Sequence, residues 1–302
     1  LITPIRSCAL VDSAANGIIA SFQRLANNLR EINPRFLILR RGRARDSNEV
    51  GWLAILKCSK TALPKRDNIR RVAASIFDDN PKLDIFAFEE SAKLTTHSQS
   101  GKRLLVLNRK LENRAENALF ELPLLSRSFV ADLSSFFQVN GGSADKLGKI
   151  VKEFDGAPAG GVLLDLYCGV GAPGLLLDDN YDRLIGAEID PASAKLAKRN
   201  DRLGNGEFYA GDSGEIIKNF RGLSPRTILL DPPRSGLNDA TLSGVLEANP
   251  ARIIYVSCNP ATFARDAAKL RVQFDLDTLA PVDMFPHTPC AEIASLWTNR
   301  RS

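Results

Sequence analysis

The sequence predicts an α/β protein: a domain with a mostly parallel sheet over residues 125–302, preceded by a smaller α+β domain over residues 1–124. Three observations support this. The chain has 302 residues, enough for about two domains. In the second half, strand-like apolar runs alternate with helical segments, the pattern of a parallel sheet. A glycine-rich turn follows the first of these strands.

The first half mixes helices and strands and carries no catalytic motif. Apolar residues at helical spacing predict a helix within 10–29, and residues 35–57 predict a hairpin tipped with Arg40, Arg41, Arg43 and Arg45. A helix over 65–77 and strands over 84–88, 103–107 and 120–125 complete the domain. Cys58 is expected to be a core residue of the second hairpin strand.

Charge is unevenly distributed between the two halves. Residues 1–124 have 21 Lys and Arg against 13 Asp and Glu, a net charge of +8, whereas residues 125–302 have 19 against 22, a net charge of −3. A basic half favours an anionic partner, although a solvated charged surface explains the numbers equally well. Arginines that contact phosphates would raise RNA affinity without reading sequence.

The remaining bulk features exclude several classes of protein. No apolar run approaches the roughly 18 residues that a membrane span needs. The first residues lack the layout of a signal peptide. The five cysteines form no CxxC pair, and such a sparse, odd set fits a reducing cytosol. We therefore expect a cytoplasmic, monomeric protein with no membrane partner.

The second half begins with a nucleotide-type unit. Gly169, Gly171 and Gly174 fit G-x-G-x-x-G directly after the strand-like run 161–166. Glu188 ends the next strand, 19 residues after Gly169, where an acidic side chain would bind the ribose hydroxyls of NAD or of another adenosine. The glycine pattern alone leaves a nicotinamide-dependent oxidoreductase open. A helix over 191–203 and a strand and turn over 207–212 follow.

Two later stretches favour methyl transfer over hydride transfer. Asp231 and two prolines end the strand 227–231, a turn similar to that of methyltransferases acting on bases. Cys258 ends the strand-like run 253–256 and precedes a helix that begins near Pro260. Its position at a helix N-terminus should favour the thiolate, so Cys258 is a candidate nucleophile. From this stretch alone, a buried structural cysteine is equally compatible.

Five motifs in this order resemble the S-adenosylmethionine-dependent RNA (uracil-C5)-methyltransferases. They are FFQVN at 136–140, DLYCGVG at 165–171, DPPRSG at 231–236, SCNPAT at 257–262 with the following Arg265 and Asp266, and DMFPHT at 283–288 with Glu292. The resemblance covers residues 125–302 and is loose over 1–124. It implies a Rossmann-like class I methyltransferase domain after a central domain that contacts RNA.

The resemblance also implies roles for individual residues. Cys258 matches the family's nucleophile and Glu292 its general base. The positions that bind S-adenosylmethionine and line the site correspond to Gln138, Tyr167, Gly169, Gly171, Ala172, Glu188, Asp212 and Asp231. The implied reaction methylates C5 of a uridine in RNA, with 23S rRNA favoured over tRNA. A non-catalytic RNA-binding relative is the alternative.

Three positions depart from the family pattern. Cys290 stands where a histidine usually precedes the base by two residues. Ala172 cannot offer a side-chain hydrogen bond to the cofactor. Cys8 resembles the last of four cysteine ligands of a 4Fe–4S cluster, whose other three ligands would lie upstream of this chain. One thiolate cannot hold such a cluster, which needs about four, so we expect a cluster only if those cysteines exist outside this sequence.

Overall fold

The protein is described here by a computed structural model. It describes residues 8, 11–25, 34–44, 49–58, 66–90, 102–112, 119–133, 135–138, 140–156, 160–288 and 290–301. The chain divides into two compact units: residues 1–122 with 132–134, and residues 123–131 with 135–302. The division thus lies close to the predicted boundary at 124/125, but a short segment on each side is exchanged.

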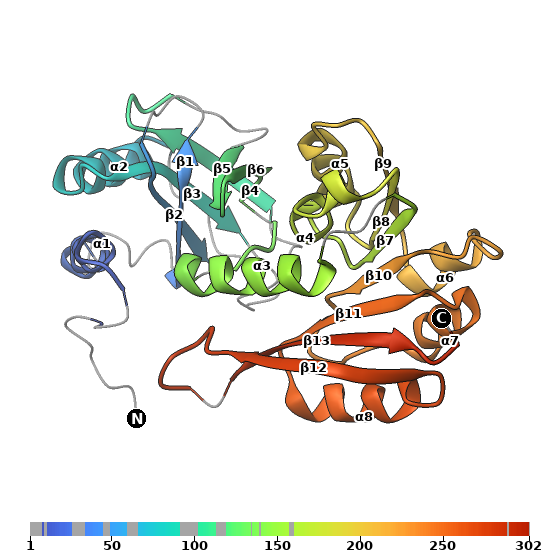
Figure 1. Ribbon diagram of the computed structural model, residues 1–302. Coiled ribbons are helices and arrows are strands. Elements are labelled where there is room, and N and C mark those ends of the chain that lie inside the picture. Colours follow the sequence, from blue (N-terminus) through green and yellow to red (C-terminus); the bar gives the residue numbers. More distant parts are fainter. Residues whose placement is uncertain are drawn as a thin grey trace. The chain divides into compact units, whose positions relative to one another are not determined.

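The first unit combines two helices with a sheet (Figure 1). Its elements are α1 (Ser13–Arg24), β1 (Pro34–Ala44), β2 (Gly51–Cys58), α2 (Arg66–Asp79), β3 (Leu83–Glu90) and β4 (Lys102–Asn108). The strand order is β4-β3-β2-β1, continued by β5 (Phe120–Leu124) and β6 (Arg127–Ala131), and the unit boundary falls within β5. Cys58 is buried in the core of this unit, as predicted.

The β1–β2 pair confirms the predicted hairpin but not the position of its arginines. β1 pairs with β2 antiparallel from Pro34 to Gly42, so Arg40 and Arg41 lie in the strand rather than in its turn. Arg43 also lies in β1 and forms an ion pair with Glu121 of β5. A strand is favoured here because Phe36 to Leu39 are apolar and β-prone. Arg45 lies outside the described residues.

The second unit contains a seven-stranded sheet with helices around it (Figure 1). Its strands are β7 (Val162–Leu166), β8 (Arg183–Glu188), β9 (Gly206–Ala210), β10 (Thr227–Leu230), β11 (Arg252–Ser257), β12 (Phe274–Val282) and β13 (Glu292–Asn299). Its helices are α3 (Gly141–Asp155), α4 (Ala172–Leu175), α5 (Pro191–Asn200), α6 (Ser213–Lys218), α7 (Asp239–Ala248) and α8 (Pro260–Leu270), with a short 3₁₀ turn over Asp178–Asn180.

The strand order β12-β13-β11-β10-β7-β8-β9 makes the sheet largely parallel, as predicted. β11, β10, β7, β8 and β9 run parallel, whereas β13 inserts antiparallel beside β11 and β12 pairs antiparallel with β13. The order reverses beside β7, and such switch points, at the carboxyl ends of the strands, are where open α/β sheets bind ligands. Trp297 of β13 is fully buried and belongs to the core of this unit.

Close helix–strand packing explains one glycine of the G-x-G-x-x-G pattern. Gly174 lies in α4, and its N–H donates to the buried carboxylate of Asp165 at 3.0 Å. A Cβ at this position would lie 2.5 Å from the same carboxylate oxygen. Only glycine lets the backbone of α4 approach β7 this closely.

We expect Gly174→Ala to destabilise the protein by about 1–3 kcal/mol, because the added methyl group overlaps Asp165 and displaces its hydrogen bond. Urea unfolding measures the change. Gly142→Ala in α3 is the matched control, since the only atom near its Cβ is 3.8 Å away and alanine favours a helix. Equal stability of the two variants would contradict this role of Gly174.

Candidate active site

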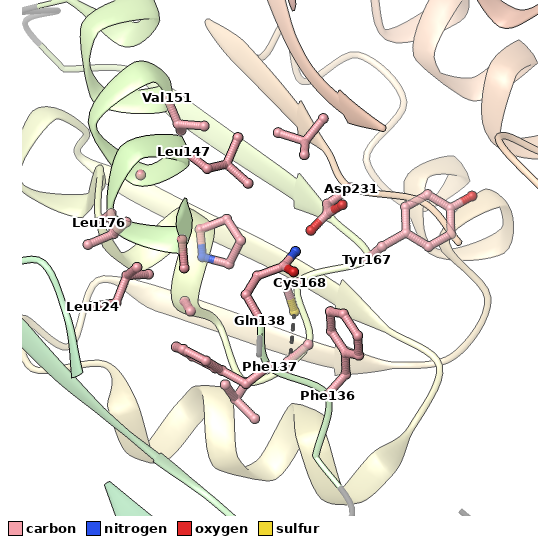
Figure 2. A pocket seen from close by; sticks show the side chains of 17 residues that line it. Leu124, Phe136, Phe137, Gln138, Leu147, Val151, Tyr167, Cys168, Leu176 and Asp231 are labelled. Atoms are coloured by element: carbon pink, nitrogen blue, oxygen red, sulfur yellow. Dashed lines mark hydrogen bonds between the residues drawn. The ribbon is translucent and has the colours of Figure 1, made fainter. Parts of the chain in front are cut away.

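A pocket opens at the carboxyl ends of the central strands of the second unit. Figure 2 shows the carboxamide of Gln138 and the carboxylate of Asp231 pointing into it. Apolar side chains of α3 form one wall, and the turn after β7 forms another. Phe136 stands at the pocket with 60% of its surface exposed. The pocket therefore combines an apolar wall with a few polar groups, as ligand sites usually do.

The turn after β7 has the backbone that close approach to a ligand requires. Gly169 and Gly171 have φ values of 56° and 85°, in the left-handed region that glycine tolerates. Tyr167 also has a positive φ of 70°, a conformation that costs energy and is often found at functional sites. Its hydroxyl donates to Thr241 at 3.1 Å, which fixes the side chain.

Glu188, at the end of β8, stabilises this turn through hydrogen bonds. Its carboxylate accepts the Gly169 N–H at 2.9 Å and the Asp190 N–H at 2.8 Å. Each carboxylate oxygen retains a lone pair for a further donor. Asp212 caps α6, accepting N–H groups of Gly214 and Glu215, and also contacts the side chain of Asn238 at 3.3 Å.

The structure brings the predicted nucleophile and base to the same end of two neighbouring strands. Ser257 at the end of β11 pairs with Ile293 near the start of β13. Cys258 directly follows Ser257, and Glu292 directly precedes Ile293. Cys258 is half-buried, whereas Glu292 is buried and its Oε2 has no hydrogen-bond partner among the described residues. An isolated carboxylate oxygen beside a thiol is suited to moving a proton.

Burial and like charges raise the pKa of three acids in this site. Burial raises the pKa of Asp231 to about 8, with further contributions from the charges of Glu292 and Asp165. Burial raises the pKa of Asp165 to about 7, with the Gly174 N–H opposing the shift. Burial also raises the pKa of Glu292, opposed by the positive charge of Arg234. The site therefore retains protons that exposed carboxyl groups lose.

The pKa of the Cys258 thiol shifts in the direction opposite to the one that the sequence predicts. Burial raises the pKa of its thiol, as do the charges of Glu292 and Asp231, while Arg234 opposes them. Cys258 lies before the N-cap Asn259 of α8, and the Asn259 side chain accepts the Ala261 N–H. The prediction that the helix N-terminus favours the thiolate was therefore wrong in its net direction, because burial of the thiol, together with two neighbouring carboxyl groups, raises its pKa.

Sequence reasoning assigned no role to Arg234, whose charge acts on both Cys258 and Glu292. Its carbonyl accepts the side chains of Asn259 at 3.1 Å and Thr262 at 3.2 Å. Its guanidinium lies 3.9 Å from the sulfur of Cys290. The arginine was visible in the DPPRSG motif, but only the fold shows which groups it faces.

Five of the eight predicted cofactor residues line the pocket: Gln138, Tyr167, Gly169, Ala172 and Asp231. Gly171, Glu188 and Asp212 do not, although Glu188 bonds the lining turn. The sequence analysis missed the wall from α3, formed by Ala144, Leu147, Gly148 and Val151. Their helical spacing was the available signal. Cys168, directly before Gly169 of the glycine turn, is buried and lines the pocket.

Cys8 does not form part of a metal site within the described chain. Its backbone N–H donates to the Asn16 side chain at 2.8 Å, and its thiol is free. Among the residues that the structure describes, no three His, Cys, Asp or Glu side chains converge on one point. A 4Fe–4S cluster therefore does not fit the described residues, and no chemistry is assigned to one. No described helix is long and apolar enough to span a membrane.

The second unit has the Rossmann-like fold of solved RNA methyltransferases. The solved structure of Pyrococcus abyssi tRNA (uracil-54, C5)-methyltransferase, in complex with S-adenosyl-L-homocysteine, has a TM-score of 0.75. It is 24% identical, and the match covers 99% of this chain and 70% of that one. The fold of Trm5b from the same organism also matches, with a TM-score of 0.56 and 15% identity over 90% of this chain and 77% of that chain.

Sequence comparisons show similarity to RNA methyltransferases. Residues 217–300 match the family model of tRNA (uracil-5-)-methyltransferase. An uncharacterized RNA methyltransferase of Lactococcus lactis is 35% identical over 59% of this chain, and one of Enterococcus faecalis is 30% identical over 88%. The chain spans 40% and 56% of their respective lengths. Residues 217–300 are thus similar to tRNA (uracil-5-)-methyltransferases, and the chain is similar to uncharacterized RNA methyltransferases.

The raised pKa of Asp231 predicts a pH-dependent effect on stability. The folded protein holds this proton up to about pH 8, whereas an unfolded chain loses it near the ordinary aspartate pKa of 3.8. The contribution of the protonated Asp231 to the free energy of unfolding is therefore fully present below pH 3.8, and it is lost as pH rises toward 8.

Asp231→Asn removes this titration, so we expect the stability of the variant relative to wild type to rise between pH 5 and pH 9. The expected gain is on the order of 1–3 kcal/mol, measured by urea unfolding at each pH. Asp275→Asn, at an exposed ion pair, is the control. A difference that stays constant with pH would show that Asp231 titrates normally.

Proposed function

We propose that this protein transfers a methyl group from S-adenosylmethionine to C5 of a uridine in RNA. The observation that carries the proposal is the placement of Cys258 and Glu292 at adjoining strand ends, beside Asp231 of the pocket, whose charge acts on Cys258 and whose pKa the charge of Glu292 raises. A thiol for attack and a carboxylate for proton removal are the two groups that this reaction needs.

The chemistry follows from the weak nucleophilicity of uracil C5. As a thiolate, Cys258 adds to C6, forming a C–S bond and moving the ring electrons into an enolate that is nucleophilic at C5. S-adenosylmethionine supplies the methyl group to C5. Glu292 then accepts the C5 proton, the C5–C6 double bond forms again, and the thiolate leaves. Arg234 favours the attacking thiolate because its charge lowers the pKa of Cys258.

The residues of the pocket fit a ligand that donates hydrogen bonds. Gln138 Oε1 is buried without a partner among the described residues, so it offers an acceptor to the cofactor. Glu188 would accept the ribose hydroxyls with its remaining lone pairs, and the glycine turn would allow close approach. Ala172 would contribute only apolar contact.

The identity of the RNA and its contacts with the first unit are part of the proposal. Arg41 in β1 is exposed and available for a phosphate, whereas Arg43 is held by Glu121. The motifs favour 23S rRNA, while the matching family model and solved structure carry tRNA names. Mapping 5-methyluridine in both RNAs from cells with and without the protein decides between them.

Glu188→Ala should weaken binding of S-adenosylmethionine about tenfold or more, because charge-assisted hydrogen bonds to the ribose are lost. Isothermal titration calorimetry measures the affinity, with Glu207→Ala as a control on an exposed ion pair. The wild-type protein should bind S-adenosylmethionine more tightly than NAD. Tighter binding of NAD would support the oxidoreductase alternative instead.

Cys258→Ala should abolish both methylation and any covalent protein–RNA adduct, since the sulfur attacks first. Glu292→Gln keeps the shape but cannot accept the C5 proton, so it should trap a methylated adduct. A denaturing gel shows the adduct as a slow band, and mass spectrometry shows its methyl group.

Cys290→Ser is the matched thiol control and should still form the adduct. An adduct that persists in Cys258→Ala but disappears in Cys290→Ser would assign the nucleophile to Cys290. Absence of single-turnover methylation by the wild-type protein, despite RNA binding, would favour the non-catalytic relative.

A further inference from the structure

Helix α5 presents a purely cationic surface to solvent. Lys195, Lys198 and Arg199 are exposed on the helix, and Arg202 is exposed just after its end. Their spacing of three and four residues places them along one side. We call these four residues the α5 stripe. The helix itself contains no Asp or Glu, so no acidic side chain interrupts it.

The α5 stripe lacks the carboxylate partners that several other cations of the second unit have. Six of those cations form ion pairs: Arg183 with Glu207, Lys218 with Glu215, Arg221 with Glu247, Arg265 with Asp266, Lys269 with Asp239, and Arg300 with Asp275. Lys146 and Lys149 of α3 are likewise exposed, and neither forms an ion pair with a described residue. Within the described residues, no carboxylate lies within 4.0 Å of the stripe's cationic groups. Arg202 contacts only the Ser128 carbonyl, at 3.3 Å.

The two acids that flank α5 are occupied elsewhere. Asp190 caps the helix by accepting the Ser193 N–H and hydroxyl. Asp201 accepts the N–H groups of Gly204 and Gly206. Neither side chain forms an ion pair with the stripe, so its positive charge is not balanced from the ends of the helix.

Helix stability alone does not account for the stripe. Lys198 and Arg199 lie in the last turn, where positive charge favours the helix dipole. Lys195 lies earlier, and Arg202 lies beyond the helix, so neither gains from this effect. Like charges three and four residues apart repel by a few tenths of a kcal/mol per pair. Residues 125–302 carry a net charge of −3, so the stripe is a local exception.

The opposite face of α5 connects the stripe to the candidate active site. Ala197 is fully buried, and a Cβ added to Gly171 of the glycine turn would lie 3.1 Å from its Cβ. The helix begins at Pro191, just after Glu188, at the strand end that carries the site. From Lys195 the stripe runs about 10 Å away from this edge.

We propose that the α5 stripe binds the phosphate backbone of the substrate RNA beside the methyl-transfer site. This inference rests on the proposed function. Flexible, unpaired ammonium and guanidinium groups suit phosphates, and such contacts position an RNA without reading its sequence. The stripe thus supplies the acidic second unit with a surface for its polyanionic substrate.

The test compares two triple variants with the same loss of positive charge. One is Lys195→Gln, Lys198→Gln and Arg199→Gln, in the stripe. The control is Lys218→Gln, Arg221→Gln and Arg300→Gln, whose cations are exposed but ion-paired. Binding of a uridine-containing RNA is measured at several KCl concentrations. We expect the stripe variant to bind several-fold more weakly and to lose about 2 from the salt slope, at roughly 0.7 per phosphate on single strands.

The control variant should keep the wild-type slope, and both variants should bind S-adenosylhomocysteine as the wild type does, which shows that they are folded. An unchanged slope in the stripe variant, or equal losses in both variants, overturns the inference. If wild-type protein methylates RNA while the slope stays unchanged, only the stripe is refuted. If the wild-type protein neither binds nor methylates RNA, the proposed function fails with it.

Discussion

The buried carboxylate of Asp266 holds together the segments at the end of the sheet where Cys258 and Glu292 lie. It accepts the Tyr255 hydroxyl and the Leu237 N–H, both at 2.8 Å, and pairs with Arg265. Arg265 in turn donates to the carbonyls of Ser235 and Leu237. The strand that leads to Cys258 and the loop that carries Arg234 are thereby tied to one helix. Gly236 is required between them, because a Cβ there would lie 2.5 Å from Asp266.

This arrangement concentrates acids where the proposed reaction requires a thiolate. Glu292 and Asp231 act on Cys258 with the same sign, and Arg234 opposes them. In the free protein the thiol form is therefore favoured, which protects the sulfur from unwanted electrophiles. A bound substrate that excludes water and orients the groups changes this balance at the moment of attack. Low reactivity at rest and reactivity toward the bound base are compatible in one site.

Periodic patterns and motifs were sufficient to predict the parallel strands and the glycine turn, and they named Cys258 and Glu292, which the fold places at neighbouring strand ends. They could not predict that β13 inserts antiparallel beside β11, because this pairing joins residues 36 to 46 positions apart. The exchange of residues 123–124 and 132–134 between units depends on tertiary packing in the same way. The direction of the Cys258 pKa shift was mispredicted, since local sequence shows the helix start but neither the burial of the thiol nor the carboxylates that the fold brings near.

The pairing of β11 with β13 limits where insertions and deletions can occur in this part of the chain. Side chains alternate between the two faces of a strand, so a shift of the β13 register by one residue would turn Glu292 away from Cys258. Insertions in the turns before and after β12 leave this ladder intact, whereas a single deletion inside β13 does not. The segment between Cys258 and Glu292 can therefore change in length only outside its strands.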